Sequence, residues 1–121
     1  MPAERTPQPD CLFCRIVRGE LPSKTIVEDD LLVAFHDIAP RSPTHILIVP
    51  KAHIPSAADL TEEDGPLLGR MFATAASIAR DQGIEDAGYR IVTNVGRWGG
   101  QTVDHLHLHL MGGRAFDWPP G

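Results

Sequence analysis

The chain has 121 residues, which suffices for one ordinary domain and hardly for two. Its 11 basic and 16 acidic residues leave a net charge of −5, which argues against binding nucleic acid or anionic membranes over a broad basic surface. No apolar stretch approaches the roughly 18 residues of a membrane span, and the first ten residues lack the apolar core of a secretory signal. We therefore expect a cytoplasmic protein with reduced cysteines that binds neither nucleic acid nor membrane.

The N-terminal half predicts an arm, a short helix and three strands. Residues 1–10 hold three prolines and no apolar cluster, which is typical of a flexible arm. Apolar residues from Leu12 to Val17 recur at helical spacing, and Gly19 is expected to end the helix. Residues 25–28 and 31–36 form a predicted hairpin around Asp29-Asp30, and a third strand is expected over residues 44–49.

The C-terminal half predicts one long helix and two strands. The helix is expected over residues 64–82, with Asp64 as its cap, Pro66 in its first turn and Gly83 at its end. We expect its buried face to contain Leu68, Phe72, Ala75, Ala76 and Ala79. Strands are expected at 89–94 and 103–111, on either side of a glycine-rich loop. Because helices and strands do not alternate regularly, the order predicts an α+β fold with an antiparallel sheet of about five strands.

Three histidines alternate with leucines in the last predicted strand. His105, His107 and His109 would share one face of it, with neighbours about 6.6–7 Å apart, while the leucines face the core. Three interpretations follow from this pattern: a polar surface strand, a metal site, or a catalytic imidazole that is largely neutral near pH 7.

Cys11 and Cys14 form a Cys-x-x-Cys pair. The spacing fits a redox pair, although the βαβ context of thioredoxin-like proteins is absent. It also fits two free buried thiols, or half of a tetrahedral zinc site that needs two more ligands. The pair alone does not choose among these hypotheses.

The alternating pattern resembles the histidine triad (HIT) superfamily, and the resemblance extends over about residues 11–121. The HINT-like branch of that superfamily is indicated by the C-terminal segments. The matching motifs are Phe35-His36-Asp37-Ile38, Pro43-Thr44-His45, Ile48-Val49-Pro50-Lys51, Gly99-Gly100-Gln101-Thr102-Val103, Gly112-Gly113-Arg114 and Trp118-Pro119-Pro120-Gly121.

The resemblance implies a HIT-like fold and a nucleotide hydrolase, in the first place a purine nucleoside phosphoramidase acting on AMP-amine or AMP-lysine substrates. His107 would attack the α-phosphorus and form a covalent nucleotidyl-histidine, from which water releases a nucleoside monophosphate. His109 and His45 would assist as further catalytic residues. The alternatives are a dinucleoside polyphosphate hydrolase or nucleotidyl transferase, a nucleotide-binding regulatory module with little turnover, and a zinc hydrolase that uses the triad as an open metal site.

The resemblance also implies a nucleotide site in which Asp37 binds the ribose hydroxyls beside an apolar slot. Leu12 and Ile16 match this slot as well. For the slot residues, a place in the core is the competing interpretation, and for Asn94 it is a backbone contact at a strand end. The implied nucleotide-binding residues are Phe13, Phe35, His36, Asp37, Ile38, Asn94, Gly100, Gln101, Thr102, Val103, His107 and His109.

A zinc-binding subset of the superfamily implies one structural Zn²⁺ per chain, held by Cys11, Cys14, His53 and His105. Four protein ligands close such a site and leave His107 free for chemistry. The resemblance further implies a homodimer with one continuous sheet, in which the Trp118 tail lies near the partner's site. Asp104, which stands where the family usually has an aromatic residue or proline, and the loop residues Arg97 and Trp98 have no assigned role.

Overall fold

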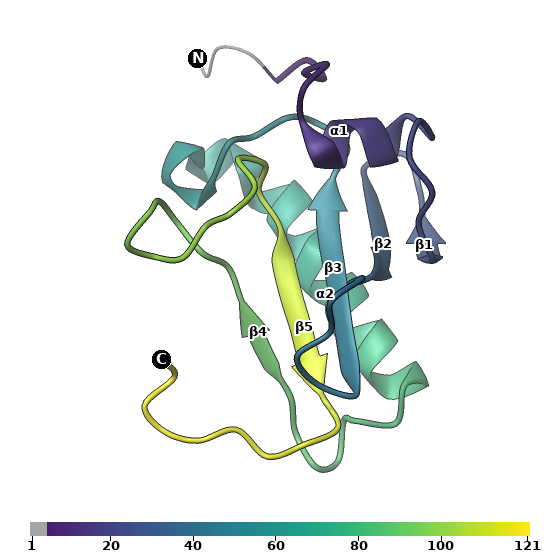
Figure 1. Ribbon diagram of the computed structural model, residues 1–121, viewed down its shortest axis with the longest axis vertical. Coiled ribbons are helices and arrows are strands. Elements are labelled where there is room, and N and C mark those ends of the chain that lie inside the picture. Colours follow the sequence, from purple (N-terminus) through teal and green to yellow (C-terminus); the bar gives the residue numbers. More distant parts are fainter. Residues whose placement is uncertain (1–4) are drawn as a thin grey trace.

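A computed structural model describes residues 5–121. The five strands form one antiparallel sheet in the order β1-β2-β3-β5-β4, which confirms the predicted α+β class (Figure 1). Within the described residues, no helix is long and apolar enough to cross a membrane. The elements are α1 Leu12–Val17, β1 Thr25–Glu28, β2 Leu32–His36, β3 Thr44–Pro50, two 3₁₀ turns Ala57–Asp59 and Glu62–Asp64, α2 Gly65–Asp81, β4 Arg90–Val92 and β5 Leu108–Gly112.

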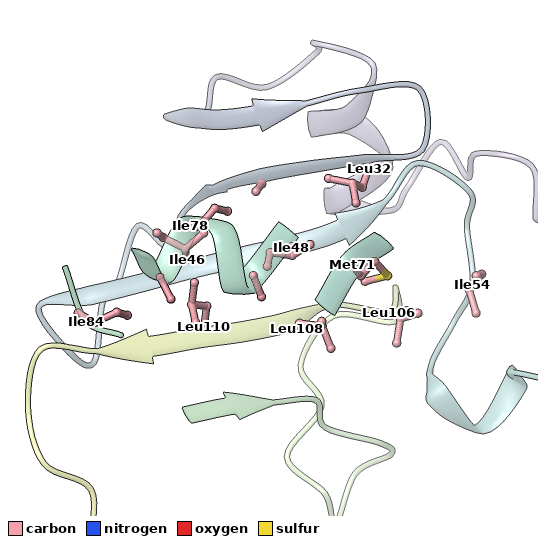
Figure 2. Close-up of a cluster of buried hydrophobic side chains, with 13 residues drawn as sticks. Leu32, Ile46, Ile48, Ile54, Met71, Ile78, Ile84, Leu106, Leu108 and Leu110 are labelled. Atoms are coloured by element: carbon pink, nitrogen blue, oxygen red, sulfur yellow. The ribbon is translucent and has the colours of Figure 1, made fainter. Parts of the chain in front are cut away.

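One face of the sheet is covered by α2, and the main core lies between them (Figures 1 and 2). Met71, Ala75 and Ile78 on the helix are buried against Ile46 and other residues of the central strands. The expected helix face was wrong at Phe72, which is 47% exposed. Ala75 and Ala79 are buried as predicted, but the other buried residues of the helix are Met71 and Ile78. The buried face is therefore rotated away from Phe72.

The other face carries a smaller apolar cluster beneath α1. Phe13 on α1 packs edge-on against Phe35 on β2, with ring centroids 5.8 Å apart. Gly19 follows α1 with a φ of +76°, as expected of a residue that ends a helix in the left-handed region. Because α1 covers only one end of this face, the sheet leaves a surface beside it on which polar side chains can gather (Figure 1).

The last two strands are shorter than predicted. β4 covers only Arg90–Val92, and β5 begins at Leu108, so His105 and His107 precede the strand. The backbone of this segment forms no strand pairs within residues 5–121. The Leu106 N–H donates to the Ile54 carbonyl at 2.6 Å, and the His105 N–H donates to the Val103 carbonyl. Leu106 nevertheless reaches the core, and the histidines stay on the opposite face.

The expected arm, residues 1–10, is described from Arg5 onward, and its mobility stays a prediction. The Arg5 guanidinium pairs with both carboxylate oxygens of Asp64 and donates to the Asp59 carbonyl. The Arg5 carbonyl accepts the N–H of His53 at 2.9 Å. Asp64 occupies the N-cap position of α2, but the prediction that its side chain caps the helix was wrong, because its carboxylate accepts from the Thr61 N–H and from Arg5.

We expect Asp64→Asn to lower the free energy of unfolding at pH 7 by about 1 kcal/mol, because it removes the charge opposite Arg5. The Arg5 guanidinium holds the pKa of the Asp64 carboxyl below its usual 3.8, at about 2. A lowered folded-state pKa stabilises above pH 4, and this contribution disappears as the pH falls from 4 to 2. Urea unfolding between pH 2 and 7 measures the free energy of unfolding of the variant and of the wild type. The control variant Asp30→Asn removes an exposed carboxylate and should show no such pH-dependent loss of stability.

Candidate functional site

The three catalytic candidates gather on the sheet face that α2 leaves open. His45 on β3 and His109 on β5 have ring centroids 5.2 Å apart, and the rings of His107 and His109 lie 4.9 Å apart. Phe13 of α1 stands edge-on over His107 at 5.0 Å. The predicted grouping of His45, His107 and His109 is therefore present, although only two of the three lie in strands.

The hydrogen bonds of His107 define its tautomer. Its Nδ1 lies 2.7 Å from the carbonyl oxygen of His105, and a carbonyl oxygen can only accept. In the neutral ring Nδ1 therefore carries the proton, and Nε2 presents a lone pair. His107 is 4% exposed, so packing fixes the direction of that lone pair. An imidazole nucleophile requires such a free, oriented lone pair.

A second chain of hydrogen bonds orients His45 and His109. The Arg41 N–H donates to Nδ1 of His45 at 3.0 Å, so in the neutral ring the proton lies on Nε2. His45 Nε2 lies 2.9 Å from Nδ1 of His109, which must then accept and carry its own proton on Nε2. Burial lowers the pKa of His45, and burial together with His107 and His45 lowers that of His109 to about 4. Both rings are therefore neutral at pH 7.

Asp37, His45 and His109 bring one carboxylate and two imidazoles within 4.8 Å, a donor set that also suits a metal ion. The hydrogen bonds argue against an ion in this state. The proton on His45 Nε2 occupies the position that a metal would need, because the Arg41 N–H fills Nδ1. The group is better described as a chain of hydrogen bonds from the Arg41 N–H through His45 to His109, with the Asp37 carboxylate 3.4 Å from His45 Nε2.

A separate cluster joins α1 to the segments that precede α2 and β5. Cys11, Cys14, His53 and His105 place their four ligand atoms within 4.8 Å of one another, close enough to hold a metal ion. Nδ1 of His105 lies 3.3 Å from Cys11 Sγ and 3.5 Å from Cys14 Sγ, and Nδ1 of His53 lies 3.3 Å from Cys14 Sγ. The structure thus brings together all four predicted metal ligands, from three separate segments.

His105 connects the two groups. Its Nε2 donates to the Pro50 carbonyl at 2.8 Å, which leaves the Nδ1 lone pair directed at the cysteine sulfurs. A backbone carbonyl behind a ligating histidine is the usual partner that fixes its tautomer. The carbonyl of the same residue accepts from His107 Nδ1. The ring of His105 therefore belongs to the cluster, and its backbone belongs to the nucleophile candidate.

The predicted nucleotide-binding residues are distributed around the histidines. Asp37, His36 and Ile38 line a cavity of about 620 Å³ that also reaches His45. Ile38 is 98% exposed, so it is not a core residue. Phe13 on α1 and Phe35 on β2 are buried against each other, and Val103 packs against the same cluster.

The glycine-rich loop uses its polar side chains to hold its own shape. The Gln101 amide donates to the carbonyls of Pro55 and Val103 and accepts from the Gly96 N–H. The Asn94 amide donates to the Gly99 carbonyl at 2.7 Å, as its competing interpretation expected. Thr102 is exposed, and Gly100 has a φ of +84°. The Gln101 side chain therefore hydrogen-bonds to backbone groups in and beside the loop, and not to the histidines.

Sequence reasoning missed the backbone groups that set these tautomers. The carbonyls of His105 and Pro50 and the N–H of Arg41 carry no signal in their side chains. Only Pro43 and Pro50, which bound the third strand, hinted that the flanking backbone adopts fixed geometry there.

Comparison with known proteins defines the class. A model of the HIT domain matches residues 18–116. The chain therefore belongs to the HIT family, and it is one of the hydrolases of that family.

Particular relatives are similar over nearly the whole chain. The chain is 49% identical over 105 residues to a purine nucleoside phosphoramidase of Escherichia coli strain K12, which covers 87% of this chain and 88% of the relative. It is 48% identical over 112 residues to a HIT-like protein of Synechococcus elongatus, covering 93% and 97%. The crystal structure of a HIT family hydrolase from Legionella pneumophila has a TM-score of 0.91 at 47% identity, covering 93% and 100%.

We expect ¹⁵N-resolved NMR of the imidazoles to find His107 protonated on Nδ1 and His109 on Nε2 at pH 7. His109 should stay neutral until the pH approaches 4, because burial lowers its pKa to about that value. Long-range ¹H–¹⁵N spectra between pH 4 and 8 report both the tautomer and the charge. A His109 ring that becomes charged near pH 6, or a His107 proton on Nε2, would contradict the hydrogen-bond assignment.

Proposed function

We propose that this chain is a purine nucleoside phosphoramidase that acts through a covalent nucleotidyl-histidine on His107. The observation that carries the proposal is the 2.7 Å hydrogen bond from His107 Nδ1 to the His105 carbonyl, which leaves a fixed Nε2 lone pair. The named activity of the Escherichia coli relative supports the substrate class.

In the first step, the His107 Nε2 lone pair forms a bond to the α-phosphorus, and the phosphorus–nitrogen bond to the leaving amine breaks. The electron pair of that bond goes to the amine nitrogen, which takes up a proton from solvent. Water then attacks the same phosphorus, the bond from phosphorus to His107 Nε2 breaks, and the nucleoside monophosphate leaves as the proton lost by the water passes to solvent. Dividing hydrolysis into two displacements lowers each barrier, and a packed nucleophile avoids the entropy cost of orientation.

His109 is the group that meets charge at the phosphoryl oxygens or the leaving nitrogen. Its Nε2–H is the end of the donor chain that begins at the Arg41 N–H and passes through His45. A neutral donor held in advance stabilises the transition state without reorganisation. The 2.9 Å contact from His45 Nε2–H to His109 Nδ1 holds the His109 ring in place and so fixes the direction of its Nε2–H, while the Asp37 carboxylate lies 3.4 Å from His45 Nε2.

The nucleoside is proposed to lie between α1 and the Asp37 loop. Phe13 and Phe35, each 4% exposed, form the buried apolar base of this region, and Asp37 offers acceptors for ribose hydroxyls. His36, Ile38 and Val103 border this region. We assign Asn94, Gly100, Gln101 and Thr102 to the phosphate side, where Gln101 acts by holding the loop.

We propose zinc for the cluster of Cys11, Cys14, His53 and His105, as a structural ion. Tetrahedral zinc–sulfur and zinc–nitrogen bonds of about 2.3 and 2.0 Å set sulfur–nitrogen separations of roughly 3.5 Å. The separations of 3.3 to 3.5 Å fit that ion. When bound, zinc supplies a cross-link among α1, the His53 segment and His105, and hence holds the carbonyl that orients His107.

Two alternatives keep specific support. A dinucleoside polyphosphate hydrolase or nucleotidyl transferase would use the same nucleophile with another leaving group or acceptor. A regulatory nucleotide-binding module would need the cavity but not the fixed tautomer of His107, so the hydrogen bond favours an enzyme. The homodimer and the cytoplasmic location stay predictions.

The decisive variant is His107→Ala. We expect wild-type protein mixed with an adenosine phosphoramidate to gain the mass of one adenylyl group after a rapid, acid-free quench. His107→Ala should show no adduct and at least about a 10³-fold loss of turnover. Its affinity for AMP should stay within about tenfold, since the ring attacks but the surrounding residues bind. Intact-protein mass spectrometry makes the measurement, and AMP release that continues in His107→Ala would refute the assignment.

Elemental analysis tests the metal. We expect one zinc per chain, lost in Cys14→Ser but kept in His36→Asn, which alters an exposed histidine outside the cluster. Removing the ion should lower Tm by roughly 5 °C or more, because bound zinc stabilises only the folded chain. Turnover that needs an ion yet yields no nucleotidyl adduct would instead favour an open catalytic metal site.

A further inference from the structure

A second cavity adjoins the histidines on the side away from Asp37. It has a volume of about 340 Å³, and its wall includes His45, His109 and Asn94. It lies over β5 and β4, whereas the Asp37 cavity lies toward β2. Since His45 borders both cavities, the two openings flank the proposed position of the phosphate.

This second cavity is basic. Arg41, Arg90 and Arg114 line it, and no carboxylate residue does so. The chain as a whole has a net charge of −5, so its composition does not explain three guanidinium groups around one opening. Local positive charge of this kind attracts an anionic ligand.

The arginines of this cavity also differ from most other arginines of the chain in their ion pairs. Within residues 5–121, the other arginines except Arg97 lie within 4.0 Å of a carboxylate; they are Arg5, Arg15, Arg18, Arg70 and Arg80. The three arginines of the cavity have no such partner among these residues. Their charges are therefore available to a group that enters from outside.

The fold holds two of these guanidinium groups in place. Arg90 and Arg114 lie over the ring of Phe116, at 4.9 and 4.2 Å from its centroid. Arg114 Nε donates to the Arg41 carbonyl, and Arg90 donates to the Asp117 carbonyl at 2.9 Å. The turn at Gly113, with a φ of +88°, brings the tail back beside β4 (Figure 1). Arg114 also donates to the Ala115 carbonyl at 3.1 Å. A guanidinium has five N–H groups, so both arginines retain free donors for a carboxylate or phosphate.

We propose that this cavity is a leaving-group subsite that selects phosphoramidates whose amine carries an anionic group, a carboxylate or a phosphate. The inference rests on the proposed function. With the nucleoside on the Asp37 side and the α-phosphorus at His107 and His109, the departing amine extends toward β4. Its anionic group pairs with Arg90 and Arg114, while the amine nitrogen takes its proton near His109 as the phosphorus–nitrogen bond breaks.

The test compares two substrates of equal size in which adenosine 5′-phosphate is joined to β-alanine or to β-alaninamide. The readout is the ratio of their kcat/KM values, carboxylate over amide. Comparing this ratio between variants cancels the intrinsic difference between the two leaving amines. We expect Arg90→Gln and Arg114→Gln each to lower the ratio roughly tenfold, the effect of one lost charge-assisted hydrogen bond.

Three controls accompany these variants. Arg97→Gln removes an arginine that also lacks a carboxylate partner in the described part of the chain but lies outside the cavity, and it should leave the ratio unchanged. Arg114→Lys should keep part of the preference, since charge remains while the planar fork is lost. Added salt should lower the wild-type ratio. Circular dichroism confirms that each variant is folded.

Separate outcomes overturn separate claims. A ratio that stays unchanged in both glutamine variants, while adducts still form, overturns the subsite and leaves the proposed function intact. The same unchanged ratio with a loss of sedimenting mass would show that the arginines bind carboxylates of a second copy instead. Wild-type protein that forms no adduct with either substrate overturns both the function and the subsite.

Discussion

The hydrogen bond between His107 Nδ1 and the His105 carbonyl connects the chemistry of this protein to its architecture. The same residue turns its ring toward Cys11 and Cys14 and is anchored behind by the Pro50 carbonyl. Any shift of the cysteine-bearing helix therefore moves the acceptor that fixes the tautomer of the nucleophile. A structural metal in that cluster would influence reactivity without touching the substrate.

The rest of the site is arranged across one face of the sheet. The strand order places β3 and β5 side by side, so His45 and His109 meet, with Asp37 on one side and Arg90 on the other. α2 buries the opposite face and gives the sheet the rigidity on which fixed donors depend (Figure 2). Burial also keeps His45 and His109 neutral at pH 7, which preserves the direction of their donor chain.

Most elements were predicted correctly where the hydrophobic pattern and the turn or capping residues indicate the same boundary. Asp29 closes the β1–β2 turn by accepting from the Leu31 and Leu32 N–H groups, as an Asp at that place predicts. Phe72 and the start of β5 were misjudged, because α2 is rotated by what it packs against and residues 105–107 are held by Ile54, far away in sequence. Helical spacing and strand alternation indicate that an element has a buried face, but they do not indicate which other element packs against that face.

The sequence by itself determined the residue types: a triad of alternating histidines, a Cys-x-x-Cys pair with two matching histidines, and the motifs of the HIT family. Tertiary structure alone decided which nitrogen of each imidazole carries its proton. Those protons follow the carbonyls of His105 and Pro50 and the N–H of Arg41. Every residue offers such a carbonyl, and every residue except proline offers such an N–H. It also decided that three arginines distant in sequence surround one cavity, because only folding brings Arg41, Arg90 and Arg114 together.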